Sequence, residues 1–488
     1  MSPAASGDQV QDALVDVDVD VVVVGFGIAG ACAAISAAEA GASVLVVERA
    51  GAPGGSSALS GGEIYLGGGT PVQQACGFDD TADDMFAFLN AALGPHADEE
   101  KLRVYCNDSA EHFRWLVDHG VEFRPSLYDA PTWMPPTTDG LMWLGENSWP
   151  FDTVARPAPR GHRPPAPHFA GKLLMDALVA AAEDVGIRTI VDTRVSSLLV
   201  ESGRVVGVRV RHYGEERELR ARKGVVLATG GFVDNEEMLA AHAPALLGHG
   251  KVSDGLDDGS GIRMAQVVGA ATRRMHAHEV ALTVLPALAA RGILVNAHGQ
   301  RFINEDTYPG TISHAAVVHQ PGPWWVVVDE AGFDDVPAAD LWGVRPTHAA
   351  ETLAELEADL GMPPGSLEAT VSAYNRCAEQ GEDPLFHKAA RWLRPLRPPY
   401  AAVDVAAGFH PGDRDSAAPA TGVAGFTLGG LHTSVDGEVL SLTGAPVPGL
   451  FAAGRATAGM HGDGYISGTS LGDGSYFGRR AGRALADS

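Results

Sequence analysis

The sequence predicts an α/β protein in which a discontinuous Rossmann-like domain is interrupted by an inserted α+β domain. Three separated segments support this prediction. Residues 20–24 are an aspartate and four valines, residues 223–231 are an apolar run that ends in small residues, and residues 449–455 are a similar run. Unbroken apolar runs are typical of buried parallel strands. Since 488 residues are too many for one ordinary core, two or three domains are expected.

The first strand leads directly into a glycine-rich turn. The turn reads Gly25-Phe26-Gly27-Ile28-Ala29-Gly30, and an alanine-rich helix is expected from about residue 31 to residue 40. A second strand over residues 43–47 then ends on Glu48. A G-x-G-x-x-G turn between a strand and a helix, with an acid at the end of the next strand, indicates a dinucleotide-binding site.

Each glycine of this turn has a physical reason. Gly25 permits the tight turn, and Gly27 lets the backbone approach a pyrophosphate. Gly30 lets the helix pack closely on the strand, and the first turn of the helix offers amide donors and a positive dipole to phosphates. Glu48 is expected to accept hydrogen bonds from ribose hydroxyls.

The other small-residue segments favour FAD over NAD. Residues 54–62 are glycines and serines with Ala58 and Leu59, which allow backbone amides to approach a flavin and its phosphates. Residues 223–231 and 449–455 supply two further pieces of the same site. NAD-binding domains usually run contiguously, so three separated pieces indicate an FAD domain that is interrupted by a substrate domain.

These segments predict a division of the chain into four parts. A disordered acidic N-terminus is expected over residues 1–18, the first part of the FAD-binding domain over 19–233, a substrate and capping domain over 234–398, and the second part of the FAD-binding domain over 399–488. Residues 123–168 are rich in proline and tryptophan, which fits either an irregular packed cap or an apolar wall over a substrate.

Charge and cysteine content exclude several classes of partner. The net charge of −26 argues against nucleic acid and anionic membranes, which would repel the chain. No stretch approaches the roughly 18 apolar residues of a membrane span, and the N-terminus lacks the basic start of a secretory signal. The four cysteines have no CxxC spacing, so a reduced cytoplasmic setting is expected, and no metal site is predicted.

The C-terminal motif carries a resemblance to a known superfamily. Residues 461–472 read HGDGYISGTSLG, and together with Ala452-Ala453-Gly454-Arg455 they resemble the closing motif of the fumarate reductase and succinate dehydrogenase flavoproteins. Residues 299–305, GQRFINE, look like that superfamily's central motif. The resemblance implies FAD, an inserted capping domain and hydride transfer to flavin N5.

Two tyrosines depart from the fumarate-reducing pattern. Members that reduce fumarate have arginines about where Tyr465 and Tyr308 stand, and an unpaired dicarboxylate would be costly to desolvate. Residues 56–62 contain no histidine, which the covalently flavinylated members have, so the FAD is expected to be non-covalent.

The tyrosines instead point to a neutral, apolar ketone and resemble those of 3-ketosteroid dehydrogenases. The Δ1-dehydrogenases of that family close with Tyr-Ala-Gly-Pro-Gly, whereas this chain has Tyr465-Ile466-Ser467-Gly468-Thr469. The Tyr-x-Ser arrangement looks like the Δ4-(5α)-dehydrogenase branch, and Tyr308 matches a catalytic tyrosine of that branch.

The resemblance implies a mechanism with four catalytic residues. Backbone amides around Gly468 would polarise the 3-keto oxygen, and Tyr465 would remove a C4 proton while the C5 hydrogen leaves as a hydride, giving a 4-ene-3-oxosteroid. Since a free tyrosine has a pKa near ~10, Ser467 and Tyr308 are expected to donate hydrogen bonds to Tyr465.

The motifs and the resemblance together predict one set of cofactor-binding residues. The set consists of Gly25, Gly27, Ala29, Gly30, Glu48, Arg49, Ser56, Ser57, Ser60, Gly61, Gly62, Val195, Ala228, Thr229, Gly230, Asp258, Gly454, Arg455, Ser470 and Leu471.

Other functions stay open at this point. A 3-ketosteroid Δ1-dehydrogenase is the first alternative, and an enone or fumarate-type flavin reductase acting on another apolar carbonyl compound is the second. A flavin-binding electron carrier without enzymatic activity is the third. For the enzymes, reoxidation of the flavin requires an external electron acceptor, whose identity the sequence leaves open.

Overall fold

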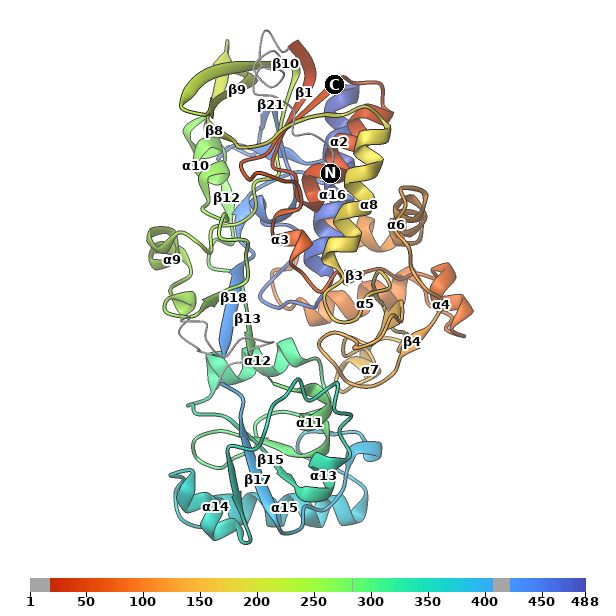
Figure 1. Cartoon of the computed structure of the whole chain (residues 1–488), viewed down its shortest axis with the longest axis vertical. Helices are drawn as coiled ribbons and strands as arrows, with labels where there is room; N and C mark the ends of the chain where they lie inside the picture. Colours follow the sequence, from red (N-terminus) through yellow and green to blue (C-terminus); the bar gives the residue numbers. More distant parts are fainter. Residues whose placement is uncertain (1–17, 283, 407–421) are drawn as a thin grey trace, which may run out of the picture.

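The computed structural model describes residues 18–282, 284–406 and 422–488. The N-terminus that was expected to be disordered therefore lies outside the described residues, except for Asp18, which begins the first strand. Figure 1 shows an elongated molecule with a large sheet and its helices at one end and a smaller sheet at the other. The mixed α/β fold that the sequence predicts is confirmed.

The large sheet has the strand order β20-β21-β10-β1-β2-β7, and β8 and β9 extend it. Its strands are β1 (Asp18–Val24), β2 (Val44–Val47), β7 (Arg188–Ile190), β8 (Thr193–Glu201), β9 (Arg204–His212), β10 (Glu215–Leu227), β20 (Glu438–Leu440) and β21 (Pro446–Ala452). Parallel pairing brings β1 beside β10 and β10 beside β21. The three apolar runs that are far apart in the sequence are thus neighbours in one sheet, as predicted.

Three long helices lie side by side against one face of this sheet (Figure 1). They are α2 (Ile28–Glu39), α8 (Gly171–Asp184) and α16 (Thr469–Asp487). Glycines allow α16 to touch α2 backbone to backbone, because a Cβ on Gly478 would lie 2.5 Å from the Ala29 carbonyl oxygen and one on Gly482 would lie 2.0 Å from that of Ala33. This close approach fixes the start of α16, which reaches the functional site.

Residues 55–169 form a layer of helices and two-residue strands beside the large sheet. Its helices are α3 (Gly55–Ala58), α4 (Pro71–Ala75), α5 (Ala82–Ala92), α6 (Glu99–Asp118) and α7 (Phe151–Val154), and its strands are β3 (Ile64–Tyr65), β4 (Leu127–Tyr128), β5 (Leu141–Met142) and β6 (Gly161–His162). A separate cluster of buried side chains, including Tyr65 and Phe88, packs this layer together. It also contains Tyr308 and Ile466, so the layer supports the site from below.

A middle layer connects the two ends of the molecule. It contains α9 (Glu236–His242), η1 (Pro244–Leu246), β11 (Gly250–Lys251), α10 (Ser260–Val267), β12 (Thr272–Arg273), β13 (His278–Leu282), β18 (Val423–Thr427), β19 (Gly430–Leu431) and η3 (Gly454–Ala456). Strand β18 pairs with both β11 and β13, and β12 pairs with β19. Segments from the predicted capping domain and from the second predicted part of the FAD-binding domain therefore share these small sheets.

The second end is a four-stranded sheet of order β14-β15-β17-β16 with helices around it. Its elements are α11 (Pro286–Arg291), β14 (Ile293–Val295), α12 (Pro309–His319), β15 (Trp325–Asp329), α13 (Glu330–Asp334), β16 (His348–Ala350), α14 (Leu353–Asp359), α15 (Ser366–Gln380), η2 (Ala390–Trp392) and β17 (Tyr400–Asp404). Strand β17 pairs with β15 here, so the predicted boundary at residue 399 falls inside this sheet.

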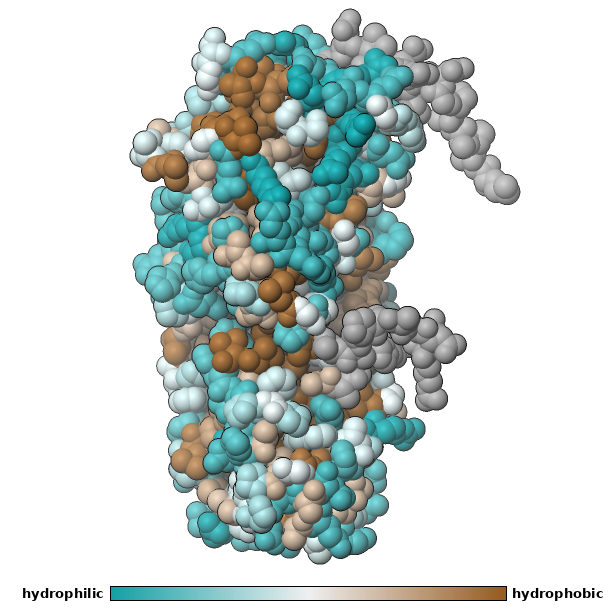
Figure 2. Space-filling view, turned by 90° about the vertical axis from the view of Figure 1, so that its left-hand side faces the viewer, coloured by the Kyte–Doolittle hydropathy of each residue, from teal (hydrophilic) through white to brown (hydrophobic). Residues whose placement is uncertain are grey.

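The surface is mainly polar. Figure 2 shows a face on which hydrophilic residues predominate and hydrophobic residues form separate patches. Within the described ranges, no helix is long and apolar enough to cross a membrane. The four cysteines are unpaired thiols.

Candidate active site

One cavity of about 660 Å³ lies where the large sheet, the middle layer and the start of α16 meet. All four predicted catalytic residues line it, namely Tyr308, Tyr465, Ser467 and Gly468. Seventeen predicted cofactor residues line it as well: Gly25, Gly27, Ala29, Glu48, Arg49, Ser56, Ser57, Ser60, Gly61, Val195, Ala228, Thr229, Gly230, Gly454, Arg455, Ser470 and Leu471. The remaining three, Gly30, Gly62 and Asp258, do not line the cavity.

The glycine turn after β1 has the geometry that its sequence predicts. Gly25 has φ +97°, and a Cβ there would lie 2.4 Å from the carbonyl oxygen of Ala228. Gly30 packs the helix onto the turn, since its Cβ would lie 1.9 Å from the Gly25 carbonyl oxygen. Among the described residues, no acceptor pairs with the amides of Ala29 and Gly30. The start of α2 therefore presents free donors to an anion.

Glu48 holds the same turn from the end of β2. Its two carboxylate oxygens accept the amides of Phe26 and Ala50, both at 2.7 Å. Because each carboxylate oxygen offers two acceptor sites, Glu48 can still accept from a hydroxyl. The neighbouring Arg49 bonds Asp258 at 2.6 Å, so Asp258 orients Arg49 from behind the wall.

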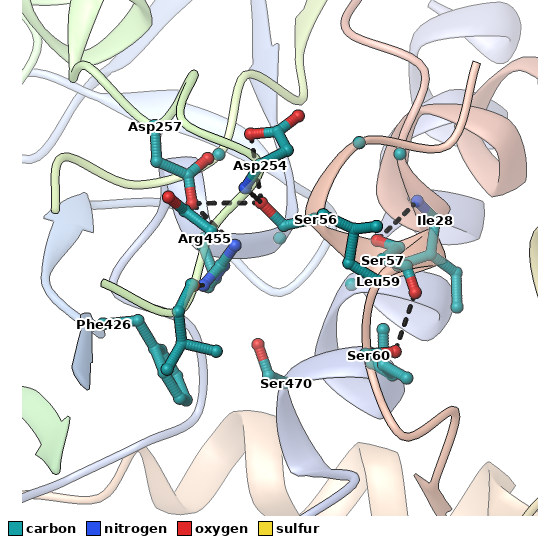
Figure 3. Close-up of a pocket in the computed structure, with 18 of the residues that line it drawn as sticks. Ile28, Ser56, Ser57, Leu59, Ser60, Asp254, Asp257, Phe426, Arg455 and Ser470 are labelled. Carbon is teal, nitrogen blue, oxygen red and sulfur yellow. Dashed lines mark hydrogen bonds and ion pairs between the residues drawn. The ribbon is translucent and has the colours of Figure 1, made fainter. Parts of the chain in front are cut away.

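Residues 54–62, the serine-rich loop, contact the cavity through their serine hydroxyls (Figure 3). Ser57 Oγ accepts the amide of Ile28 at 3.2 Å, and Ser60 Oγ donates to the Ser57 carbonyl at 2.7 Å. Ser56 lies beside Asp254 and Asp257, and its Oγ is 3.3 Å from Asp254 Oδ1. The loop is thereby fixed against both α2 and the middle layer.

Arg455 and Asp257 form an ion pair next to Ser56 (Figure 3). The distance between Arg455 and Asp257 is 2.7 Å, and the guanidinium lies 5.2 Å from the ring centroid of Phe426. Burial raises the pKa of Asp257, and Arg455 opposes that rise. Of the two adjacent aspartates, Asp257 faces the cavity, whereas the sequence analysis selected Asp258.

The residues present fit FAD. The free amides of α2, the acceptor Glu48 and the narrow walls of glycine and serine suit a dinucleotide. Thr229 Oγ1 and Glu63 Oε1 are buried and have no hydrogen-bond partner within the described part of the chain. Both residues line the cavity, and orphaned buried polar atoms are expected where a polar ligand binds.

The far end of the cavity is apolar. Its wall is formed by Trp133, Met134, Phe169, Ala281, Leu282, Val284, Leu285, Trp342, Ala424 and Phe426. The indole nitrogen of Trp133 donates to the Val284 carbonyl at 2.7 Å, which fixes the ring in the wall. Trp143 and Trp149 of the same tryptophan-rich segment do not line the cavity. Residues 123–168 are therefore partly an apolar wall of the cavity and partly a packed cap outside it.

Tyr308 and Ser467 form a hydrogen-bonded pair. The Tyr308 hydroxyl lies 2.8 Å from Ser467 Oγ and accepts the Ser467 amide at 2.9 Å. Tyr308 is the N-cap residue of α12, and its side chain is almost fully buried. Burial raises the pKa of Tyr308, and Glu279 adds to that rise, whereas the contacts with Ser467 lower it.

Tyr465 lies in the loop before α16, between two rings. It stacks on His461 with centroids 5.6 Å apart and meets Phe426 edge-on at 5.2 Å. Burial raises the pKa of Tyr465, Glu279 adds to the rise, and Arg455 and the Ser470 amide oppose it. At neutral pH Tyr465 is therefore a neutral hydroxyl that can donate a hydrogen bond.

This geometry corrects one expectation about Tyr465. Ser467 and Tyr308 were expected to donate hydrogen bonds to its hydroxyl, but they bond to each other instead. The physical reason is that the Ser467 amide and hydroxyl both contact the Tyr308 hydroxyl, while the Ser470 amide is the group that hydrogen-bonds to Tyr465.

The start of α16 closes the site. Gly468 has φ +83°, and a Cβ there would lie 2.7 Å from the Tyr65 amide nitrogen. The Thr469 amide bonds the Ile466 carbonyl, whereas no backbone acceptor is recorded for the Ser470 amide among the residues described. The Ser470 amide, which acts on Tyr465, and the positive helix dipole thus face the cavity.

Four acidic residues that line the cavity are absent from the predicted set, namely Glu63, Asp254, Asp257 and Glu279. Glu63 follows the serine-rich loop, and Glu279 lies in the otherwise apolar strand β13. A lone acid in an apolar strand is a signal that could have identified Glu279. The sequence signal for Glu63 is weaker, because a glutamate that follows a loop of glycines and serines looks like an ordinary surface residue.

Comparisons with known proteins identify FAD-binding relatives over nearly the whole chain. A family model described as "FAD binding domain" matches residues 20–471. A solved structure of 3-ketosteroid-Δ4-(5α)-dehydrogenase from Rhodococcus jostii RHA1, in complex with 4-androstene-3,17-dione, is 49% identical, with a TM-score of 0.91. The alignment covers 97% of this chain and 98% of that one.

Two further relatives are more distant. A probable fumarate reductase, Ifc3, of Shewanella frigidimarina is 30% identical over 470 residues, which is 93% of this chain and 72% of that protein. A 3-oxosteroid 1-dehydrogenase of Mycolicibacterium smegmatis is 28% identical over 558 aligned positions, covering 94% of this chain and 95% of that protein. The similarity thus spans both FAD segments and the region between them.

Proposed function

This chain belongs to the family described as FAD binding domain, and on that basis we propose that it dehydrogenates 3-ketosteroids between C4 and C5. Its FAD and its membership of the flavoprotein superfamily agree with the sequence analysis. The observation that carries the steroid assignment is the 49% identity, over nearly the whole of both chains, to a Δ4-(5α)-dehydrogenase. The product is a 4-ene-3-oxosteroid.

The charges of the cavity support a neutral substrate. Among the described lining residues, the cations are Arg49, Arg194, Lys251 and Arg455. Arg49 and Arg455 are paired with aspartates, and the apolar end of the cavity contributes no cation. A dicarboxylate placed there would lose its hydration without gaining an ion pair, which disfavours fumarate.

Tyr465 and the start of α16 bind the carbonyl oxygen of the substrate. The neutral Tyr465 hydroxyl donates a hydrogen bond, and the Ser470 amide lies beside it. Donors that are fixed in a buried site stabilise the charge that develops on an enolate oxygen. The neighbouring C4 hydrogens thereby become more acidic.

The Tyr308–Ser467 pair is placed to remove the C4 proton. Ser467 Oγ receives the proton from C4 while its own proton moves to the Tyr308 oxygen 2.8 Å away. Each hydroxyl gives up a proton as it receives one, and the net proton leaves the pair from Tyr308 for a further acceptor, so no isolated phenolate has to form. Tyr465 as the base, which the sequence analysis favoured, would require a free phenolate in a buried site. Bound FAD supplies the acceptor for the C5 hydride.

Two alternatives keep some support. The 3-oxosteroid 1-dehydrogenase relative favours Δ1 chemistry, although this chain lacks the Tyr-Ala-Gly-Pro-Gly ending. A reductase acting on an apolar enone would use the same hydroxyls in the opposite direction. In each case an external electron carrier must exchange electrons with the flavin. The four unpaired thiols favour a reducing compartment such as the cytoplasm.

Product analysis tests the proposed regiochemistry. The purified holoenzyme is incubated with 5α-androstane-3,17-dione and an artificial electron acceptor, and the product is identified by chromatography against standards. We expect 4-androstene-3,17-dione. A 1-ene-3-one product would establish Δ1 chemistry, and an unchanged steroid would remove the steroid assignment.

A further inference from the structure

A buried carboxyl group lies in the apolar part of the cavity and has no role so far. Glu279 belongs to β13, is 5% exposed and lines the cavity. On β13 it pairs with Phe426 of β18, the residue that meets the ring of Tyr465. Its position is therefore fixed by the small sheet of the middle layer.

Glu279 is a close neighbour of Tyr308. Gly310 lies between them. A Cβ on Gly310 would be 2.2 Å from Tyr308 Cε1, 2.8 Å from Tyr308 Cζ and 2.8 Å from Glu279 Oε1. Only a glycine leaves room for the ring and the carboxyl group to approach each other there. The carboxyl group thus lies beside the hydroxyl-bearing edge of the Tyr308 ring.

No cation compensates Glu279. No salt bridge from its carboxyl group is found within the described residues, and the only group that opposes the effect of burial is the Val280 amide. Burial raises the pKa of Glu279 well above its usual range. A carboxylate with a raised pKa is a stronger base than an exposed one, and a base works best when its pKa is close to the working pH.

We propose that Glu279 is the terminal proton acceptor of the reaction and takes from Tyr308 the proton that leaves C4. The inference rests on the proposed dehydrogenation. It adds what the hydroxyl pair lacks, because Ser467 and Tyr308 pass a proton along without retaining one. No direct hydrogen bond joins Glu279 to Tyr308, so the final transfer occurs across the Gly310 gap through a water molecule or after a small side-chain rotation.

The step balances in protons and charge. The C4–H bond breaks and an O–H bond forms on Ser467, while the Ser467 proton moves to Tyr308 and the Tyr308 proton moves to Glu279. Negative charge passes from the Glu279 carboxylate to the enolate oxygen near Tyr465. The C4=C5 bond forms as the C5 hydrogen leaves as a hydride, for which bound FAD would supply the acceptor.

The surrounding groups are compatible with this role. The titratable side chains that face Glu279 are Tyr308, from the segment before α12, and Tyr465, from the loop before α16. Strand β18 contributes the uncharged Phe426. Two other charged groups act on Tyr465, namely Arg455 of η3 and Glu63, which follows the serine-rich loop. An ionised Glu279 raises the pKa of both tyrosines, which keeps their hydroxyls protonated.

The test measures flavin reduction by 5α-androstane-3,17-dione in single-turnover stopped flow between pH 5 and pH 9. For the native protein we expect the rate to rise with pH as Glu279 ionises. For Glu279→Gln we expect a rate about a hundredfold lower that no longer rises over this range, with flavin content and affinity for 4-androstene-3,17-dione unchanged. Glu379→Gln, an exposed substitution on α15, is the matched control.

Chemical rescue separates a proton acceptor from a structural residue. Glu279→Ala opens space beside Tyr308, and we expect added acetate to restore part of its rate in proportion to the acetate concentration. A Glu279→Gln protein with native rate and pH profile would overturn the inference, as would a Glu279→Ala protein that acetate leaves unchanged. If the native protein itself is not reduced by the steroid, the proposed function fails, and the inference fails with it.

Discussion

The hydroxyl of Tyr308 lies 2.8 Å from Oγ of Ser467, although the two residues are 159 positions apart in the chain. Tyr308 begins α12, and Ser467 precedes α16, which packs on the large sheet. The pair therefore joins the predicted capping domain to the FAD-binding part at the cavity itself. Chemistry that depends on this pair requires both parts to be correctly docked.

Removal of either hydroxyl of the pair should abolish proton transfer while leaving the cofactor bound. We expect Tyr308→Phe and Ser467→Ala each to lower kcat by at least about a hundredfold, because a positioned base contributes that much. The double variant should be little slower than either single variant, since the two hydroxyls act as one unit. Steady-state kinetics at equal flavin content measures this.

Tyr465→Phe tests whether Tyr465 binds the substrate carbonyl rather than acting as the base. It should lower the rate and weaken binding of 3-keto ligands, because it removes a donor to the carbonyl oxygen. Tyr213→Phe, at an exposed tyrosine in the β9–β10 turn, is the control and should change neither. Full activity in Tyr308→Phe together with complete loss in Tyr465→Phe would favour Tyr465 as the base instead.

The glycine turn should be intolerant of one added methyl group. A Cβ on Gly30 would lie 1.9 Å from the Gly25 carbonyl oxygen, so Gly30→Ala must displace α2 from β1. We expect purified Gly30→Ala to contain less than a tenth of the native FAD, as measured by the ratio of visible to ultraviolet absorbance. Gly51→Ala, whose Cβ would be 3.4 Å from its nearest neighbour, should retain native FAD content.

The apolar wall should determine steroid affinity. Trp133 lines the cavity, and Trp133→Ala removes an aromatic surface whose burial is worth about 1.5–3 kcal/mol. We expect the Kd for 4-androstene-3,17-dione, followed by the flavin spectrum, to rise about tenfold or more. Trp143→Ala, outside the cavity, should bind normally, and equal effects of both substitutions would contradict the assignment of the wall.

Buried histidines should make the fold sensitive to acid. Burial lowers the pKa of His162 from 6.5 to about 4, so between these values only the unfolded chain binds the proton. Stability is complete above pH 6.5 and falls by roughly 3 kcal/mol as the pH approaches 4. His162→Asn keeps a donor near the Arg160 carbonyl and should flatten the dependence of Tm on pH in this window. The control substitution His298→Asn, at an exposed histidine, should leave the dependence of Tm on pH unchanged.

Local patterns predicted the cofactor half of the site well. The valines of β1 and the glycine turn are contiguous in sequence, and the strand and the tight turn form as their local pattern predicts. Glu48 holds that turn through the Phe26 amide, and its bond to ribose hydroxyls stays a prediction. The parallel pairing of β1, β10 and β21 followed from three apolar runs, because buried parallel strands have a recognisable composition.

The substrate half depended on contacts that no local pattern contains. The partner of Tyr308 is set by how α12 and α16 dock, so the expected bond to Tyr465 was wrong. Asp257 rather than Asp258 faces the cavity because of the exact path of one tight turn. The domain boundary at residue 399 missed β17, because a strand five residues long looks the same in either sheet.

Anaerobic mixing of the yellow holoenzyme with 5α-androstane-3,17-dione, followed by the visible absorbance of the flavin, tests the central claim most directly. We predict that the flavin bleaches and that one equivalent of 4-androstene-3,17-dione forms per flavin. Bleaching by 4-androstene-3,17-dione alone, with a 1,4-diene as product, would contradict the proposed C4–C5 chemistry. A flavin that neither steroid reduces would contradict the steroid assignment altogether.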